Sequence, residues 1–333
     1  MASNRNRRTA FRCAAACWFA LTLAASHPVL AQDYPARPVR IISQAGIGSA
    51  PDVMARIVAD QLGKAWGQQA IIINRPGASG ANAAQMAAGA EPDGYTLFMA
   101  NSSTFTIMPE TQSKLSFDVA RDFVPAGFVA EQPMLIAVTA GLPVTTLAEL
   151  IALAKKRPGQ LLYAANAGGS TPNVTGEFFR ERAGIDITYV SYPGAAAGLT
   201  DVVAGRVQII VEGLPALLGA VEAQSIRPLA VLATTRLPNL PDVPVAGDTL
   251  PGFVATGWSA LMARTGTPPE IIRKISADMI NGLDQPDVRA RFAQLGAYVK
   301  PMSPEALAAY IQAQQALWRP IVRKVLAKGG GRE

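Results

Sequence analysis

The sequence predicts an α/β fold of mostly parallel β-sheets flanked by helices. Short apolar runs of strand length alternate with stretches of helical period, and such alternation is typical of the crossover connections that build parallel sheets. Loops of small residues follow several of the predicted strands. If the first 31 residues are a leader, 302 residues remain, which is near the size at which one hydrophobic core usually divides into two domains.

The individual elements follow from apolar spacing and run length. Eight short apolar segments are predicted as strands: Val39–Ser43, Ala70–Ile73, Thr96–Ala100, Leu135–Thr139, Leu161–Ala164, Thr188–Val190, Val207–Val211 and Pro228–Thr234. Five stretches between them are predicted as helices: Val53–Leu62, Ala81–Ala90, Thr146–Lys156, Val174–Ala183 and Ala195–Ala204. A tail without strands follows, with helices expected over Ile271–Leu283, Pro286–Leu295 and Pro304–Val325. We expect this tail to pack on the outside of the sheet.

Residues 1–31 are predicted to be a cleaved signal peptide. Four arginines precede a mostly apolar stretch of 14 residues, Cys13–Ser26, and Val29 and Ala31 then occupy the −3 and −1 positions of a cleavage site. The apolar stretch is shorter than the roughly 20 residues that a membrane-spanning helix needs. We therefore expect cleavage after Ala31 and export to the periplasm.

The residues beyond Ala31 exclude several classes of function. The only histidine, His27, and both cysteines, Cys13 and Cys17, lie in the predicted leader, so Ser-His and Cys-His catalytic pairs are excluded, and a metal site would have carboxylates alone as ligands. Without the four leader arginines, 26 Lys and Arg stand against 24 Asp and Glu. A net charge of +2 gives no basic face for nucleic acid. We expect no nucleic-acid partner, no metal and no cofactor.

Candidate binding residues lie in the small-residue loops at the carboxyl ends of the predicted strands. These loops are Ser43–Ser49, Asn101–Thr104, Asn166–Thr171 and Tyr192–Ala196. Ligands of open α/β sheets bind at this edge, and the helix starts that follow the loops favour anions. A purely structural interpretation stays open, because Ser49 with Asp52 has the spacing of a capping box, and Thr171 before Pro172 has the pattern of an N-cap.

An exported α/β enzyme is the competing interpretation. Gly46 and Gly48 follow a strand and precede a helix, and Arg75 ends the next strand, as in an NADP-dependent oxidoreductase. However, Pro51 occupies the place of the third glycine of that motif. Export would also limit access to the cofactor.

Five short motifs resemble those of the Bug receptors, the extracytoplasmic solute-binding proteins of tripartite tricarboxylate transporters. They extend in unbroken order over nearly all of the chain beyond the leader: Tyr34–Arg40, Asn74–Ala78, Pro92–Leu97, Leu240–Pro244 and Asp287–Arg291. The resemblance implies a two-lobed (type II-like) periplasmic binding protein with two crossing segments. Lobe one would combine residues 32–135 and 256–333, and residues 136–255 would form lobe two. Implied partners are a small carboxylate and membrane transporter subunits, and we expect a monomer.

The resemblance also implies which residues meet the ligand carboxylate. The matching positions are Gly46, Ile47, Gly48, Ser49, Ala50, Ser102, Ser103, Thr104, Gly169, Ser170, Thr171, Tyr192, Gly194, Ala195 and Ala196. The first loop departs from the family's proline-and-glycine pattern, and Pro193 replaces a common basic residue. Glu212, after the strand Val207–Val211, is expected either to face the cleft or to be a solvated strand end.

Overall fold

The computed structural model describes residues 34–112 and 114–327. The predicted leader, its cleavage site and the residues Cys13, Cys17 and His27 lie outside this part of the chain. The chain divides into two units, Met1–Ala36 and Arg37–Glu333. The fold described below is that of the second unit.

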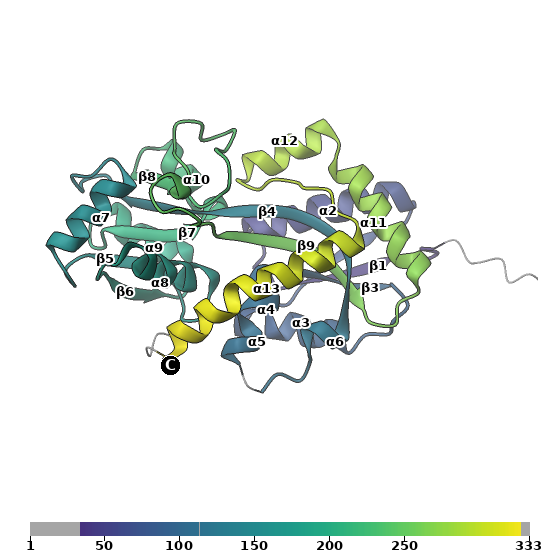
Figure 1. The fold of residues 1–333 in the computed structure, drawn as a ribbon. Coiled ribbons are helices and arrows are strands. Elements are labelled where there is room, and N and C mark those ends of the chain that lie inside the picture. The colour runs from purple at the N-terminus through teal and green to yellow at the C-terminus, as the bar shows by residue number, and fades with distance from the viewer. Residues whose placement is uncertain (1–33, 113, 328–333) are drawn as a thin grey trace, which may run out of the picture. The chain divides into compact units, whose positions relative to one another are not determined.

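Nine strands of the described residues pair in one sheet (Figure 1). Along the sheet the strands are β2 (Ala70–Asn74), β1 (Val39–Ser43), β3 (Thr96–Asn101), β9 (Thr256–Arg264), β4 (Phe123–Thr139), β7 (Ile209–Gly213), β5 (Leu162–Asn166) and β6 (Thr188–Tyr192), with β8 (Ile226–Val231) also paired to β4. The alternation of strands and helices confirms the predicted α/β class.

The strand β4 runs through two parts of this sheet. Its residues Phe123–Pro133 pair with β9, and Met134–Thr139 pair with β7 and β8. We call β1, β2, β3, β9 and Phe123–Pro133 the first half-sheet, and Met134–Thr139 with β5, β6, β7 and β8 the second half-sheet. The chain passes from the first to the second inside β4 and returns just before Thr256, where β9 begins.

The pairing is more mixed than the alternation of elements suggested. The pairs β1–β2, β1–β3, β5–β6 and β5–β7 are parallel, whereas every pair that involves β4 or β9 is antiparallel. Strand β9 and the first part of β4 were not predicted from the sequence. Pro125 and Gly127 interrupt the apolar pattern there, and the structure accommodates them at a register shift between these two residues.

The predicted helices are present, and shorter ones join them. The predicted set corresponds to α2 (Ala50–Trp66), α3 (Ala81–Ala88), α7 (Leu147–Lys156), α8 (Thr171–Ala183), α9 (Ala195–Val203), α11 (Pro269–Leu283), α12 (Pro286–Gln294) and α13 (Pro304–Ala327). The helices that the sequence analysis missed are α4 (Ser102–Thr106), α5 (Met108–Thr111), α6 (Val119–Asp122) and α10 (Leu214–Glu222). As expected, the tail packs outside the sheet, with α11 and α13 both against β4.

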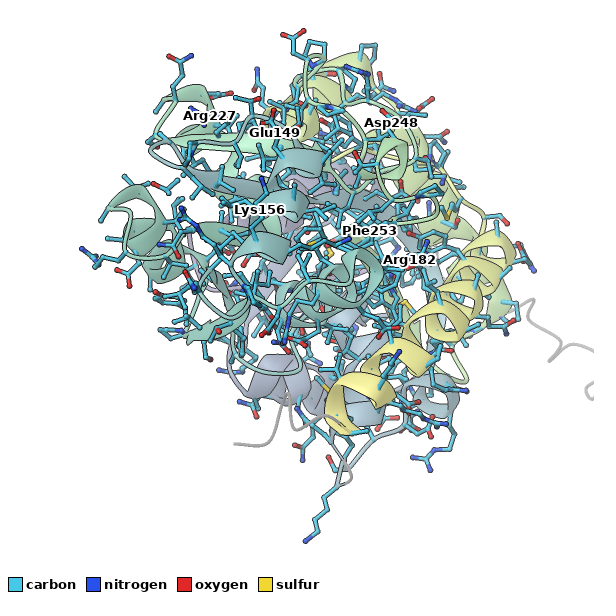
Figure 2. The ribbon with its side chains drawn as sticks, turned by 60° about the vertical axis from the view of Figure 1, so that its left-hand side comes forward. Glu149, Lys156, Arg182, Arg227, Asp248 and Phe253 are labelled. Atoms are coloured by element: carbon cyan, nitrogen blue, oxygen red, sulfur yellow. The ribbon has the colours of Figure 1, made fainter. Side chains whose placement is uncertain are left out.

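The helix α13 contributes to the cores of both half-sheets. Leu307 and Ile311 belong to the apolar cluster of the first half-sheet, whereas Trp318 and Val322 belong to that of the second. Figure 1 shows this helix, in yellow, lying across both half-sheets. The second core also contains Phe253, labelled in Figure 2, whose ring centroid lies 5.9 Å from that of Phe179.

Candidate ligand-binding site

A cavity of about 490 Å³ lies between the two half-sheets, at the carboxyl ends of parallel strands. One wall comes from residues that follow β1 and β2, from the end of β3, and from α4 and α5, and the opposite wall comes from the loop after β5. The lining residues are Gln44, Gly77, Gly80, Asn101, Ser103, Met108, Thr111 and Gln112 on the first wall, and Ala167, Gly168, Gly169 and Ser170 on the second. This is the sheet edge at which the sequence predicts a ligand.

The cavity lining is polar but carries no charged side chain. Its side-chain groups are hydroxyls and amides, and glycines expose the backbone. The 13-residue helix α8 starts at the second wall, and its positive dipole end favours a negative charge there. An anion in this cavity would be held by neutral donors.

The loop before α8 is fixed by Asn173. Its Oδ1 accepts a hydrogen bond from the Gly169 N–H at 3.0 Å, and its own N–H donates to Ser170 Oγ at 3.3 Å. Ser170 is therefore the N-cap, and the expectation that Thr171 fills this role is wrong. Asn173 is fully buried, and within the described chain its Nδ2 has no hydrogen-bond partner. Buried donors without partners are rare and often mark functional sites.

A second amide is held in the opposite wall. Gln44 Oε1 accepts from the Thr104 hydroxyl at 3.0 Å, while the buried Gln44 Nε2 has no partner among the described residues. This side chain needs a glycine at position 80, since a Cβ there would lie 1.6 Å from Gln44 Oε1. Asn101 is the N-cap of α4, and its Oδ1 accepts from the Thr104 N–H at 3.2 Å and from Ser103 Oγ at 2.8 Å.

The segment Gly46–Ala50 follows the lining residue Gln44 in the chain and is held in place by Asp52. The Gly48 N–H donates to Asp52 Oδ2 at 3.0 Å, and the carboxylate is 1% exposed. Burial raises the pKa of Asp52, but hydrogen bonds from Gly48, Asn74 and Arg56 outweigh it and lower this pKa below its usual value. The capping-box expectation is wrong, because Ser49 makes no side-chain cap bond.

In the segment Tyr192–Ala196 the tyrosine hydroxyl bonds to a neighbouring helix and is not part of the cavity lining. The Tyr192 hydroxyl donates to Asp201 Oδ2 of α9 at 2.6 Å, and burial together with this bond raises the pKa of Tyr192 to about 12. Gly194 starts α9 in an extended conformation. Here the sequence signal corresponds to a helix start.

Glu212 is buried, which makes the expectation of a solvated strand end wrong. Its side chain is 7% exposed and accepts from the Gly213 N–H at 2.8 Å. Burial raises the pKa of Glu212 to about 7, although bonds from Gly213 and Asn166 act in the opposite direction. It does not belong to the cavity lining.

Of the residues predicted to bind a ligand, Ser103, Gly169 and Ser170 line the cavity and the others do not. Four further lining residues, Gln44, Asn101, Ala167 and Gly168, lie within the predicted loops, whereas the sequence analysis missed Gly77 and Gly80, which follow β2. It also missed Met108, Thr111 and Gln112, because α5 gives no signal in the sequence.

Two features are absent from residues 34–112 and 114–327. No group of three or more His, Cys, Asp or Glu residues could hold a metal ion in this part of the chain. None of its helices has the length and apolar character to cross a membrane.

Comparisons with known proteins agree with this architecture. The family model of the tripartite tricarboxylate transporter family receptor matches residues 54–326. Protein BugT of Bordetella pertussis is 33% identical over 316 residues, which cover 93% of this chain and 96% of BugT.

Two solved structures with bound ligands are similar in fold and sequence. R. palustris Rpa4515 with adipate has a TM-score of 0.80 at 33% identity, covering 87% of this chain and 98% of that one. MatC (Rpa3494) from Rhodopseudomonas palustris with bound malate has a TM-score of 0.76 at 30% identity, covering 87% and 100%.

Proposed function

Because the chain belongs to the receptor family of tripartite tricarboxylate transporters, we propose that it captures a small carboxylate in the periplasm and delivers it to membrane subunits of such a transporter. The ligand is an organic acid or a carboxylated amino-acid derivative. It binds in the cavity between the half-sheets, and two lobes close around it. Lobe one comprises residues 32–135 and 256–333, and lobe two comprises residues 136–255.

The observation that carries this proposal is the uncharged polar cavity that both half-sheets build at their strand ends. A carboxylate removed from water needs hydrogen-bond donors to offset its desolvation. Ser170 supplies a hydroxyl, Gln44 supplies an amide N–H that has no partner among the described residues, and Thr171 supplies the first N–H of α8. The adipate and malate bound to the two similar structures are small carboxylates of the expected kind.

The remaining parts of the proposal concern processing and chemistry. Cleavage after Ala31 releases a mature protein that begins at Gln32 and acts as a monomer. It performs no chemical step, needs no cofactor and releases its ligand unchanged. Family membership supports a receptor function over the alternative of an exported enzyme.

A thermal-shift screen of the mature protein tests the function. Adipate, malate and other carboxylates of similar size should raise the melting temperature, since a ligand at 100 times its Kd stabilises the native state by about 2.7 kcal/mol. Adipamide, which has the same chain and no charge, is the matched control and should not. No shift with any carboxylate, or equal shifts with adipate and adipamide, would contradict the proposal.

A further inference from the structure

Glu110 forms the centre of an ion-pair cluster between α5 and α13. Its two carboxylate oxygens accept from Arg319 Nε and Arg323 Nε, each at 2.7 Å. Glu110 is 12% exposed, whereas the arginines are 52% and 67% exposed. Although burial raises the pKa of Glu110, the hydrogen bonds and charges of both arginines lower it below the usual range. The carboxylate therefore stays ionised and paired.

The short helix that carries Glu110 is a wall of the ligand cavity. Three residues close to Glu110 in the chain line the cavity: Met108, Thr111 and Gln112. Thr111 also meets the opposite wall, because a Cβ on Gly169 would lie 3.3 Å from Thr111 Cγ2. The position of α5 therefore sets the distance between the walls at this point.

By its place in the chain α13 belongs to segment 256–333 of lobe one, but the end that carries these arginines packs in the core of the second half-sheet. Trp318 is 1% exposed and packs in the second core, with its ring centroid 6.4 Å from that of Phe178. Lys324 Nζ pairs with Glu181 of α8 at 2.5 Å. The same α8 begins at the second wall of the cavity. The cluster thus connects the α5 wall, through α13, to the structure behind the other wall.

We propose that Glu110, Arg319 and Arg323 form a latch that positions α5 and favours the closed cavity. These residues do not belong to the cavity lining, so they act on a ligand through Thr111 and its neighbours. A carboxylate with two charge-assisted bonds holds its partners more firmly than a single exposed ion pair does. The latch concerns closure and does not depend on which ligand is bound.

A distance measurement between the lobes tests the latch without a ligand. The chain beyond Ala31 has no cysteine, so Met86→Cys on α3 and Val203→Cys on α9, which replace exposed side chains, accept spin labels at two defined sites. Double electron–electron resonance then reports closed and open populations. Glu110→Gln should raise the open-to-closed ratio about tenfold, the effect of losing charged hydrogen bonds. Raising salt from 50 to 500 mM should open the labelled protein that retains Glu110 and leave Glu110→Gln nearly unchanged.

Asp60→Asn is the matched control, because it removes the Asp60–Lys64 ion pair on α2, which spans 2.8 Å and lies away from the cavity. It should change neither the distances nor their salt response. Arg319→Gln with Arg323→Gln should reproduce Glu110→Gln, and Arg319→Lys with Arg323→Lys should restore most of the closed population. If Glu110→Gln and the double variant Arg319→Gln with Arg323→Gln give the same distances as Asp60→Asn, the latch is overturned. If Glu110→Gln does not fold, an absence of salt-induced opening in the labelled parent protein would overturn it equally.

Adding adipate separates this inference from the proposed function. Failure of adipate and other carboxylates to bind would remove the proposed function, while the distances without ligand would still decide the latch. If carboxylates bind, Glu110→Gln should weaken their affinity mainly through faster dissociation.

Discussion

Gly169 and Thr111 meet across the candidate binding cavity from opposite half-sheets, and the absence of a side chain on Gly169 allows this approach. A Cβ on Gly169 would lie 3.3 Å from Thr111 Cγ2. Gly169 also has a φ of +75°, a conformation that favours glycine. Two separate requirements for glycine therefore coincide at the point where the walls touch.

Gly169→Ala should weaken ligand binding as well as stability. The left-handed φ alone costs about 1 kcal/mol, and the added methyl group also pushes the walls apart. Gly205→Ala is the control, since Gly205 has the same φ of +75° and its Cβ would meet only Thr139 Oγ1 at 3.9 Å. Chemical denaturation and calorimetry should show similar stability losses for both variants and reduced affinity for Gly169→Ala alone. Unchanged affinity would show that wall contact at Gly169 is not needed for binding.

Ser170→Ala combined with Thr171→Ala should weaken carboxylate binding by roughly 1–3 kcal/mol, the cost of leaving a buried charged group without its donors. The loss of the Ser170 cap lowers stability by about 1 kcal/mol as well. Thr146→Ala removes the N-cap of α7, where Thr146 Oγ1 accepts from the Glu149 N–H at 3.1 Å, and controls for this loss. If calorimetry gives all three proteins the same affinity, the start of α8 does not bind the ligand.

Glu212 should make the fold less stable as the pH rises from about 4.5 to 7. Burial raises the pKa of Glu212 from 4.5 to about 7, so the folded state binds a proton in this interval that the unfolded state has released. Glu212→Gln removes this dependence and should gain about 2–3 kcal/mol relative to the parent protein between pH 4 and pH 8. Thermal denaturation at both pH values measures the stability of Glu212→Gln relative to the parent protein. If this relative stability is the same at pH 4 and pH 8, Glu212 lies in a solvated environment.

The same variant tests whether Glu212 faces the ligand. If Glu212 reaches the ligand although it lies outside the cavity lining, its ionised carboxylate repels dianions, and Glu212→Gln then strengthens malate binding at pH 8 and weakens the binding of ligands that carry an ammonium group. Equal effects on both ligand types, or none, would remove Glu212 from the binding site.

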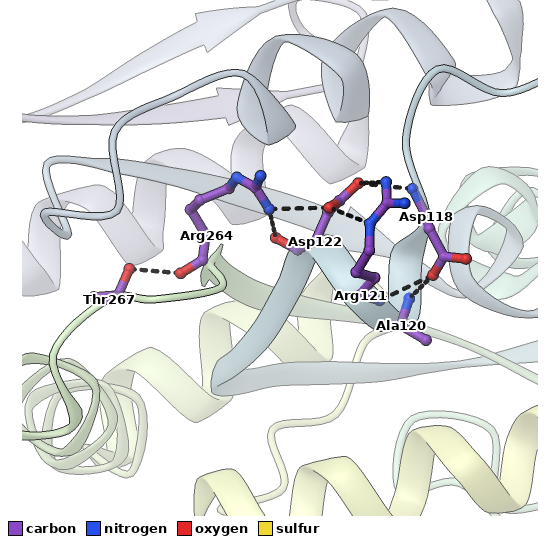
Figure 3. A network of polar contacts seen from close by, with 6 residues as sticks. All are labelled: Asp118, Ala120, Arg121, Asp122, Arg264 and Thr267. Carbon is purple, nitrogen blue, oxygen red and sulfur yellow. Dashed lines mark hydrogen bonds and ion pairs between the residues drawn. The ribbon is translucent and has the colours of Figure 1, made fainter.

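Asp122→Asn should destabilise the fold by about 3 kcal/mol, because it leaves charged partners of a buried carboxylate unpaired. Figure 3 shows Asp122 between Arg121, whose Nε donates at 2.9 Å, and Arg264, whose Nη1 donates at 3.1 Å. The bond from Arg121 is the main cause that holds the pKa of Asp122 far below its ordinary value of 3.8. This stability is complete above pH 4 and is lost as the pH falls towards the lowered pKa. Acid denaturation that is identical in Asp122→Asn and the parent protein would contradict this assignment.

The sequence predicted the parts of the fold where local pattern and tertiary structure agree. Strands such as Val39–Ser43 and helices such as Val53–Leu62 have a clear period, and the structure contains them. The first part of β4 escaped prediction because Pro125 and Gly127 break that period, and only pairing with β9 makes it a strand. Likewise α13 reads as one amphipathic helix, and its sequence does not reveal that it enters two cores.

The candidate site was predictable where it coincides with strand ends, as at Ser103 and Ser170. It was not predictable at Thr111 and Gln112, because a wall formed by α5 depends on how the half-sheets face each other. The loop at Tyr192 carries a similar small-residue signal, yet its hydroxyl is engaged by Asp201. Loop composition alone does not separate a helix start from a ligand contact.

Isothermal titration of the mature protein with carboxylates, run beside Thr111→Trp, tests whether this cavity is the receptor site. An indole at position 111 would occupy part of the cavity of about 490 Å³ from the α5 wall and obstruct a ligand there. We expect saturable binding of adipate, malate or a related acid to one site in the parent protein. We also expect loss of that binding in Thr111→Trp, which circular dichroism should show to be folded. Binding of equal strength in both proteins, or no binding of any carboxylate to the parent protein, would contradict the assignment of this cavity as the receptor site.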